Sequence, residues 1–320
     1  MLGLINRLAG GDGIKHGLNI LIYHRVLPTA DPLFPGEVTA ERFEWQMRLL
    51  ARHFNVLPLQ EAVSCLASGT LPRAAAAITF DDGYADNLTV ALPILQRYRL
   101  PATVFVATAY LDGGIMWNDR VIHAMRTVPA GHLDLQSCGL GVHEVGDLAS
   151  RQAAIRDLLG KLKYLEWQAR EDRVNQLVDA LRITQPTDMM LTTPQLKQLA
   201  AATGVDIGGH TRTHPILSRL DVASARAEIA DGRAELEAIV GYRPRLFAYP
   251  NGGPNQDYAA EHAAIVRELG FDAAVSTAWG AARPGADLFQ LPRFTPWDLQ
   301  PLKFSLRLAS NYRRDNYALA

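Results

Sequence analysis

The sequence predicts an α/β fold in which a parallel sheet or barrel carries its helices on the outside. Short apolar runs have the length of buried strands, and they occupy residues 18–23, 54–58, 75–80, 102–107, 205–208, 245–249 and 273–276. Helix-like stretches lie between them, and the clearest cover residues 39–53, 195–204 and 224–241. Because strands that alternate with helices of this length build β/α units, we expect parallel strands beneath a layer of helices.

The composition limits the classes of protein that need to be considered. The chain has 320 residues, 48% of them hydrophobic, which is enough for one large core or two smaller domains. Its 32 basic and 33 acidic side chains leave a net charge of -1, so there is no electrostatic case for a nucleic-acid partner. Cys65 and Cys138 are the only cysteines, and two cysteines are no disulfide framework.

The first residues predict neither export nor a membrane span. Residues 1–17 are interpreted as an N-terminal extension without the pattern of a signal peptide, followed by a catalytic domain over 18–320. The sustained apolar run at 18–23 is far shorter than the ~20 residues that a transmembrane helix needs. We therefore expect a soluble, cytoplasmic protein. The apolar start "MLGLINRL" leaves peripheral attachment to the inner face of the membrane as an alternative.

One region interrupts the alternation of strands and helices. Residues 111–186 contain no run that is typical of a strand, and within them 149–182 have the pattern of two linked amphipathic helices. We interpret this region as a helical insertion between two β/α units. It would either cover a substrate cleft or form a contact between subunits, and the sequence leaves the oligomeric state open.

The stretch "ITFDDGYADN" places two adjacent carboxylates, Asp81 and Asp82, directly after an apolar strand. Aspartates before a glycine are also ordinary residues of turns and helix caps, so the pair has a structural explanation as well. In a parallel α/β fold, however, active sites gather beyond the carboxyl ends of the strands. The position of the pair therefore favours a functional role.

A second polar group, His210 and His214 in "IGGHTRTHPIL", follows the strand at 205–208. Pro215 disfavours the α conformation for His214, and two successive glycines are a poor helix interior, so we expect a tight loop. With Asp82 the two histidines would form a two-histidine, one-carboxylate site that suits Zn²⁺ or another divalent ion holding a water. Asp81 would then be free to take a proton. His210 alone would equally suit a structural role.

The motifs "TFDDGYADN", "GGHTRTHP" and "FAYPNG" resemble those of the polysaccharide deacetylase family, also called the NodB homology domain or carbohydrate esterase family 4. The resemblance runs from "LIYHRV" to "LPRF", apart from the insertion. It implies a distorted (β/α) barrel of about seven strands and metal-dependent removal of acetyl groups from glycans. It also implies that Asp81 is the general base and that Asp82, His210 and His214 bind the metal, with Zn²⁺ expected and Co²⁺ or Ni²⁺ as alternatives.

Two features of the family pattern are missing. The family has an arginine that braces the base where this chain has Ala248, and Pro250 and Asn251 replace its Pro-Tyr pair. The backbone N–H of Asn251 would then serve the oxyanion. The late histidine that the family uses as general acid is also absent, because no histidine follows His262.

Two other residues could fill these positions. His24 follows the first strand and is our choice for the general acid, although it also fits an ordinary surface histidine. Arg293 in "LPRF" could supply the cation beside Asp81, or simply be a solubilising arginine.

The resulting hypothesis is metal-assisted hydrolysis of the acetamide on an amino sugar. The substrate would be an acetylated glycan or a lipid- or nucleotide-linked precursor, as in exopolysaccharide biosynthesis. Three alternatives stay open: an O-acetyl esterase with the same machinery, a non-haem iron oxygenase with the same ligands, and a catalytically silent glycan-binding protein.

Overall fold

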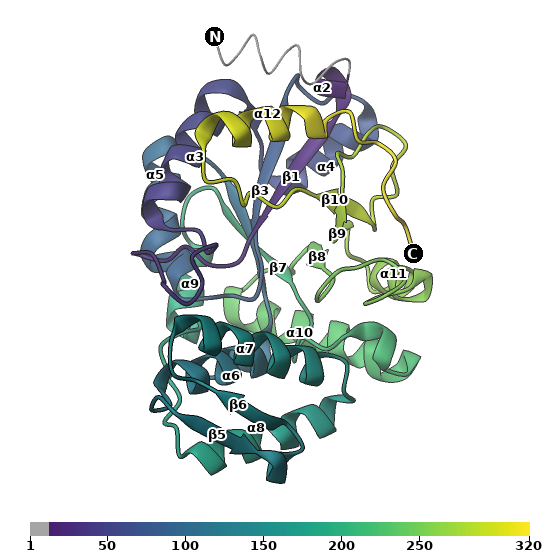
Figure 1. Ribbon diagram of the computed structural model, residues 1–320. Helices are drawn as coiled ribbons and strands as arrows, with labels where there is room; N and C mark the ends of the chain where they lie inside the picture. The colour runs from purple at the N-terminus through teal and green to yellow at the C-terminus, as the bar shows by residue number, and fades with distance from the viewer. Residues whose placement is uncertain (1–12) are drawn as a thin grey trace.

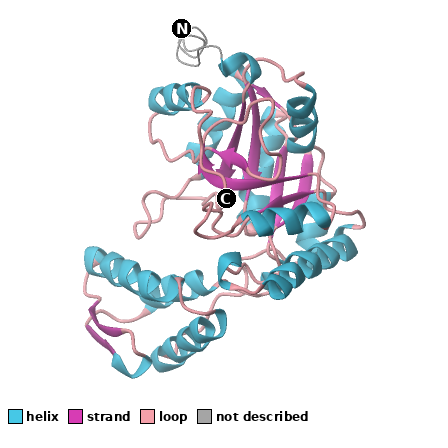
Figure 2. Ribbon diagram, turned by 90° about the vertical axis from the view of Figure 1, so that its right-hand side faces the viewer, coloured by secondary structure: helices cyan, strands magenta, loops and turns pink. Residues whose placement is uncertain are grey.

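The computed structural model describes residues 13–320. Residues 1–12, which include most of the expected N-terminal extension and its apolar start, lie outside this range. The chain forms a barrel-like body with a smaller lobe attached at one end, as Figures 1 and 2 show. The short helix α2 (Gly13–His16) leads into the first strand of the barrel.

A parallel sheet that curls into a nearly closed barrel forms the centre of the body. In spatial order its strands are β1 (Leu18–Tyr23), β3 (Ala75–Phe80), β4 (Ala102–Val106), β7 (Val205–Gly209), β8 (Leu246–Ala248), β9 (Ala273–Trp279) and β10 (Leu291–Arg293). The short β2 (Asn55–Val56) pairs with the beginning of β3. The backbone of Phe294 returns to β1, because its N–H donates to Ile20 (2.7 Å) and its carbonyl accepts from Ile22 (3.1 Å). The predicted parallel barrel of about seven strands is therefore confirmed.

The central strands are buried along their whole length. Every residue of β1 and β3 is buried, as expected for strands that have the barrel interior on one side and helices on the other. The outer helices are α3 (Ala40–His53), α4 (Leu59–Ser68), α5 (Leu92–Tyr98), α9 (Thr193–Ala200), α10 (Val222–Val240), α11 (Ala260–Glu268) and α12 (Pro301–Asn311). Side-chain caps start three of them, since Thr39 accepts from Arg42 at α3, Thr192 from Gln195 at α9 and Asp221 from Ser224 at α10. None of the helices between residues 13 and 320 is long and apolar enough to span a bilayer.

The smaller lobe lies within the region expected to be a helical insertion. It contains α6 (Trp117–Thr127), β5 (His132–Leu135), β6 (Gly141–Glu144), α7 (Leu148–Lys163) and α8 (Trp167–Leu181). The expectation that residues 111–186 hold no strand is wrong, because β5 and β6 form an antiparallel hairpin. This hairpin does not join the barrel sheet. The lobe has its own apolar core, and Leu33 from the loop after β1 packs into that core.

The backbone of α10 approaches the loop that carries His210 and His214 very closely. A Cβ atom on Gly232 would lie 2.6 Å from the carbonyl carbon of Thr211 and 2.9 Å from the nitrogen of Arg212. No real side chain makes contacts this short, and backbone has little freedom to move aside. Glycine at position 232 therefore lets the helix hold the loop in place.

We predict that Gly232→Ala destabilises the protein by about 1–3 kcal/mol, although alanine is intrinsically better in a helix. The matched control is Gly160→Ala in α7, where nothing lies within 4 Å of the added Cβ. That variant should be as stable as the parent or more stable. Chemical denaturation of the three proteins measures the difference, and equal stability of the two variants would contradict the close approach.

Candidate active site

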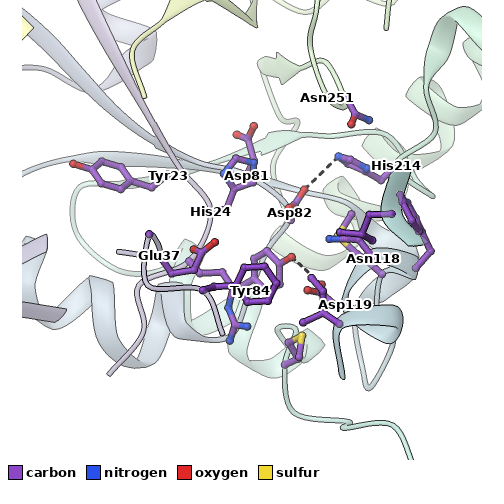
Figure 3. A pocket seen from close by; sticks show the side chains of 18 of the residues that line it. Tyr23, His24, Glu37, Asp81, Asp82, Tyr84, Asn118, Asp119, His214 and Asn251 are labelled. Atoms are coloured by element: carbon purple, nitrogen blue, oxygen red, sulfur yellow. Dashed lines mark hydrogen bonds and ion pairs between the residues drawn. The ribbon is translucent and has the colours of Figure 1, made fainter. Parts of the chain in front are cut away.

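Three side chains from two strand ends converge at the mouth of the barrel, and Figure 3 shows two of them, Asp82 and His214. Asp82 follows β3, while His210 and His214 follow β7. The Nε2 atom of His210 lies 3.3 Å from Oδ1 of Asp82, and the Nε2 atom of His214 lies 3.4 Å from the same oxygen. One ligand atom from each residue can be chosen so that all lie within 4.8 Å of one another. This is the geometry of a small, convergent set of metal ligands.

The backbone around these ligands is held in an uncommon conformation. Asp82, Thr211 and His214 have φ values of 75°, 63° and 53°, in the left-handed region that costs a non-glycine residue roughly 1–2 kcal/mol. The loop is fixed by hydrogen bonds: Thr211 Oγ1 accepts from the N–H of His214 (3.1 Å), and the carboxylate of Glu228 in α10 accepts from the N–H of Thr213 (2.8 Å). The histidines therefore lie on a rigid loop, as expected, and not on a helix.

Both imidazoles direct Nε2 toward Asp82. His210 donates from Nδ1 to the carbonyl of Ala248 (2.7 Å), which directs its Nε2 toward Asp82. Burial lowers the pKa of His214 to about 4, so this ring is neutral near pH 7. Burial also lowers the pKa of His210, but the contact with Asp82 and the charge of Asp81 outweigh it and raise the pKa. The site thus favours positive charge between His210 and Asp82.

The surroundings of Asp82 Oδ1 show whether a metal ion would fit between these three residues. This oxygen is buried and accepts no hydrogen bond from any residue between 13 and 320. A buried carboxylate oxygen without a partner is unfavourable, and it faces two ring nitrogens across 3.3 Å and 3.4 Å. A divalent cation would satisfy all three atoms. Two nitrogens and one oxygen are a donor set that suits Zn²⁺.

The neighbouring carboxylate, Asp81, is bound elsewhere. Arg293 donates from Nη1 to Oδ1 and from Nη2 to Oδ2 of Asp81, both at 2.7 Å, and its Nε donates to the carbonyl of Ser276 (2.8 Å). Both side chains are buried. Burial opposes the ionisation of Asp81, but the charge of Arg293 outweighs it, so the pKa of Asp81 lies below its usual range. The structure thus places an arginine on the expected base, from β10 and not from position 248.

The turn after β8 presents an unused backbone donor. Pro250 is buried, and its carbonyl accepts from the N–H of Gly252 (2.6 Å). Asn251 lines the cavity with a φ of 58°, and its carbonyl accepts from Thr277 Oγ1 (2.9 Å). No hydrogen bond in the described part of the chain uses the Asn251 N–H. This group is available to a bound ligand.

His24 stands at the rim of the same cavity. Its side chain is exposed, and its carbonyl accepts from Asn87 Nδ2 (2.8 Å). Burial raises the pKa of Asp82, but the imidazoles of His214, His210 and His24 outweigh it, so the pKa falls well below its usual value. His24 is therefore within electrostatic reach of the ligand cluster, and Figure 3 shows it on the side of Asp81.

The cavity has a volume of about 650 Å³ and is lined by the barrel and by the smaller lobe. Tyr84, which follows the aspartate pair, donates to Asp119 at the start of α6 (2.8 Å). Burial raises the pKa of Asp119 to about 6. Asn118, beside it, lies near His214 in Figure 3. The sequence analysis did not predict a place in the site for Asn118 or Asp119. Their only signal in the sequence is the polar pair that they form in "MWNDR", and it is weak.

Comparisons with known proteins extend these observations. The sequence profile of the family described as polysaccharide deacetylase matches residues 68–274. The chain is 40% identical over 58 residues to the peptidoglycan-N-acetylmuramic acid deacetylase PdaC of Bacillus subtilis, a match to 18% of this chain and 12% of PdaC. It is 35% identical over 91 residues to YxkH of the same organism, which covers 28% of this chain and 31% of YxkH. The matched segments are thus well under half of either relative.

Solved structures resemble the whole fold. The deacetylase PplD of Streptococcus pyogenes, solved in complex with acetate, superposes with a TM-score of 0.61 at 19% identity and covers 92% of this chain and 98% of PplD. IcaB from Ammonifex degensii gives a TM-score of 0.57 at 20% identity, over 93% of this chain and 97% of IcaB. At these identities the comparison with solved structures supports the fold alone.

Proposed function

The chain belongs to the polysaccharide deacetylase family, and from this premise we propose that it is a metal-dependent deacetylase. It would hydrolyse N-acetyl groups on an amino-sugar glycan or glycan precursor and release acetate. One observation carries the proposal: a buried Asp-His-His cluster, in which one carboxylate oxygen accepts no hydrogen bond from the described residues, lies beside a second, arginine-bound carboxylate. The printed names of PdaC and PplD, one a deacetylase of N-acetylmuramic acid and one solved with acetate, agree with it.

In this proposal Asp82, His210 and His214 hold the ion, most naturally Zn²⁺. When bound, such an ion supplies a Lewis acid for the acetyl carbonyl and lowers the pKa of a water. The residues themselves need no rearrangement, because the loop after β7 and the bond from His210 to Ala248 already fix both rings. This is the preorganisation that a catalytic metal site requires.

Asp81 acts as the general base that removes a proton from the attacking water. Its lowered pKa keeps it ionised at neutral pH. Each of its oxygens accepts one hydrogen bond from Arg293 and retains a second acceptor site, so the carboxylate can still take a proton. Arg293 is a positioning residue, since it holds Asp81 in one orientation and stabilises its charge.

Two further groups complete the reaction. The N–H of Asn251, after Pro250, donates to the oxygen that becomes negative when the acetyl carbon is attacked, and such a donor typically contributes roughly 10²–10³-fold to the rate. His24 donates a proton to the departing amine, because histidine is the side chain that most often transfers protons in catalysis and this one stands at the open rim. The products are acetate and a free amino sugar.

The proposal is tested by acetate release from N-acetylglucosamine oligosaccharides and from matched O-acetylated ones. We expect release from the N-acetyl substrates, loss of activity with chelator, and recovery with Zn²⁺. Asp81→Asn should keep the bound metal and lose roughly 10²–10⁴-fold in kcat. Release from O-acetyl substrates alone would favour the esterase, and no release from either would favour a binding protein.

The role of His24 makes a separate prediction. A leaving amine needs a proton, whereas the leaving group of an activated ester scarcely does. His24→Ala should therefore lower kcat on an acetamide far more than on an aryl acetate. Parallel assays of both substrates measure the ratio, and equal losses would assign His24 to substrate positioning and not to proton donation.

A further inference from the structure

A buried arginine of the smaller lobe, Arg170 in α8, lines the active-site cavity and has no partner there. Its side chain is only 3% exposed. The Nε and Nη2 atoms are buried and donate to no acceptor between residues 13 and 320, and no ion pair in that range includes Arg170. The guanidinium carbon lies 5.0 Å from the ring centroid of Trp117, which offers a π face but no hydrogen-bond acceptor of its own.

The acidic residues close to Arg170 form no hydrogen bond or ion pair with its side chain in the described chain. Glu171 pairs with Arg120 (3.3 Å), and the carboxylate of Glu166 accepts from the first N–H groups of α8, at 3.0 Å from Gln168 and 3.3 Å from Ala169. Burial lowers the pKa of Arg170, and the nearby Tyr110, Glu171 and Glu166 only partly offset this effect. A buried charge without a hydrogen-bonding partner is costly, so a ligand that supplies the partner would offset the cost.

The unpaired positive charge is confined to one wall of the cavity. Lys163, at the end of α7, also lines it, and within the described chain its ammonium group pairs with no carboxylate and lies 5.3 Å from the Tyr164 ring centroid. Two other arginines that line the cavity are neutralised, Arg25 by Asp86 (2.8 Å) and Arg126 by Asp31 (2.6 Å). Both unpaired cations therefore belong to the smaller lobe.

A neutral polar atom on the same wall also lacks a partner. The Oδ1 atom of Asn118 is buried and accepts no hydrogen bond from the described residues. Asn118, in α6, lies between Asp119 and His214 in Figure 3, so it is on the side of the lobe that faces the metal ligands. A sugar hydroxyl would supply the donor that this oxygen lacks.

We propose that the smaller lobe forms a subsite for an acidic glycan, in which Arg170, aided by Lys163, binds a carboxylate or phosphate group of the substrate. Asn118 accepts from a hydroxyl between that group and the acetylated sugar. A guanidinium fork matches the paired oxygens of both anions, which explains why arginine and not a neutral donor occupies this position. The proposal rests on the proposed function, because the same cavity must hold the acetyl group near Asp82 and His214.

The test compares three N-acetylglucosamine tetrasaccharides: a neutral one, one with a carboxymethyl ether and one with a phosphate monoester on a neighbouring sugar. Acetate release gives kcat/KM for the parent, Arg170→Gln, Lys163→Gln and the control Arg156→Gln, an exposed arginine of α7 outside the cavity. We expect the parent to prefer one or both acidic substrates by roughly 10- to 100-fold, the usual worth of a charge-assisted hydrogen bond. Arg170→Gln should abolish the preference, Lys163→Gln should reduce it, and Arg156→Gln should keep it.

Binding measured without turnover separates this subsite from the proposed activity. Calorimetry with the deacetylated tetrasaccharides in the presence of chelator should show the same preference and its loss in Arg170→Gln, even if the protein releases no acetate. Thermal melts check that each variant is folded, and Lys163→Gln, at a half-exposed position, tests the charge if Arg170→Gln does not fold. Equal affinity of the parent for neutral and acidic glycans, or an unchanged preference in both variants, would overturn the proposal.

Discussion

The bidentate ion pair between Asp81 and Arg293 is the interaction on which the arrangement of the site depends. It joins the end of β3 to β10 across the barrel, between residues that are 212 positions apart. A buried ion pair of this kind costs desolvation and is seldom retained for stability alone. Here it binds one carboxylate on both oxygens, while the adjacent Asp82, with its left-handed backbone, faces the two histidines. Two neighbouring aspartates thereby acquire different environments, and so different proposed roles.

The groups proposed for chemistry and those proposed for recognition lie in different parts of the structure. The barrel supplies the groups that would carry out hydrolysis, all from loops at the carboxyl ends of its strands. The smaller lobe supplies the opposite wall of the cavity. The contacts that join it to the barrel include Tyr84 with Asp119, Arg126 with Asp31, and Leu33 in the lobe's core. Because these contacts are buried or paired, the wall has a defined position relative to the metal ligands. A lobe of this kind can change substrate preference while the barrel residues stay the same.

The parts of the site that sequence reasoning could predict are those encoded locally. The strands at 18–23 and 75–80 are continuous apolar runs, and parallel topology then requires Asp82 and His210 to meet at one edge. The sequence could name Arg293 as a candidate but could not distinguish it from an arginine that only increases solubility. Its contact with Asp81 depends on how the barrel closes. The β5–β6 hairpin was missed because each strand has four residues, and in β5 they alternate between exposed and buried. Arg170 gave no signal and Asp119 only a weak one, since their roles arise only from the docking of the lobe. The proton donor and the identity of the metal stay predictions.

The central claim is that Asp82, His210 and His214 hold one ion while Arg293 keeps Asp81 away from it. Anomalous diffraction at the zinc edge, from crystals of the Zn²⁺-loaded protein, tests this most directly. We expect one strong peak at about 2.0–2.2 Å from an oxygen of Asp82 and from Nε2 of each histidine. Asp81 should still be paired with Arg293 in the same crystals. A peak elsewhere, or an ion coordinated by Asp81 with Arg293 displaced, would contradict the account.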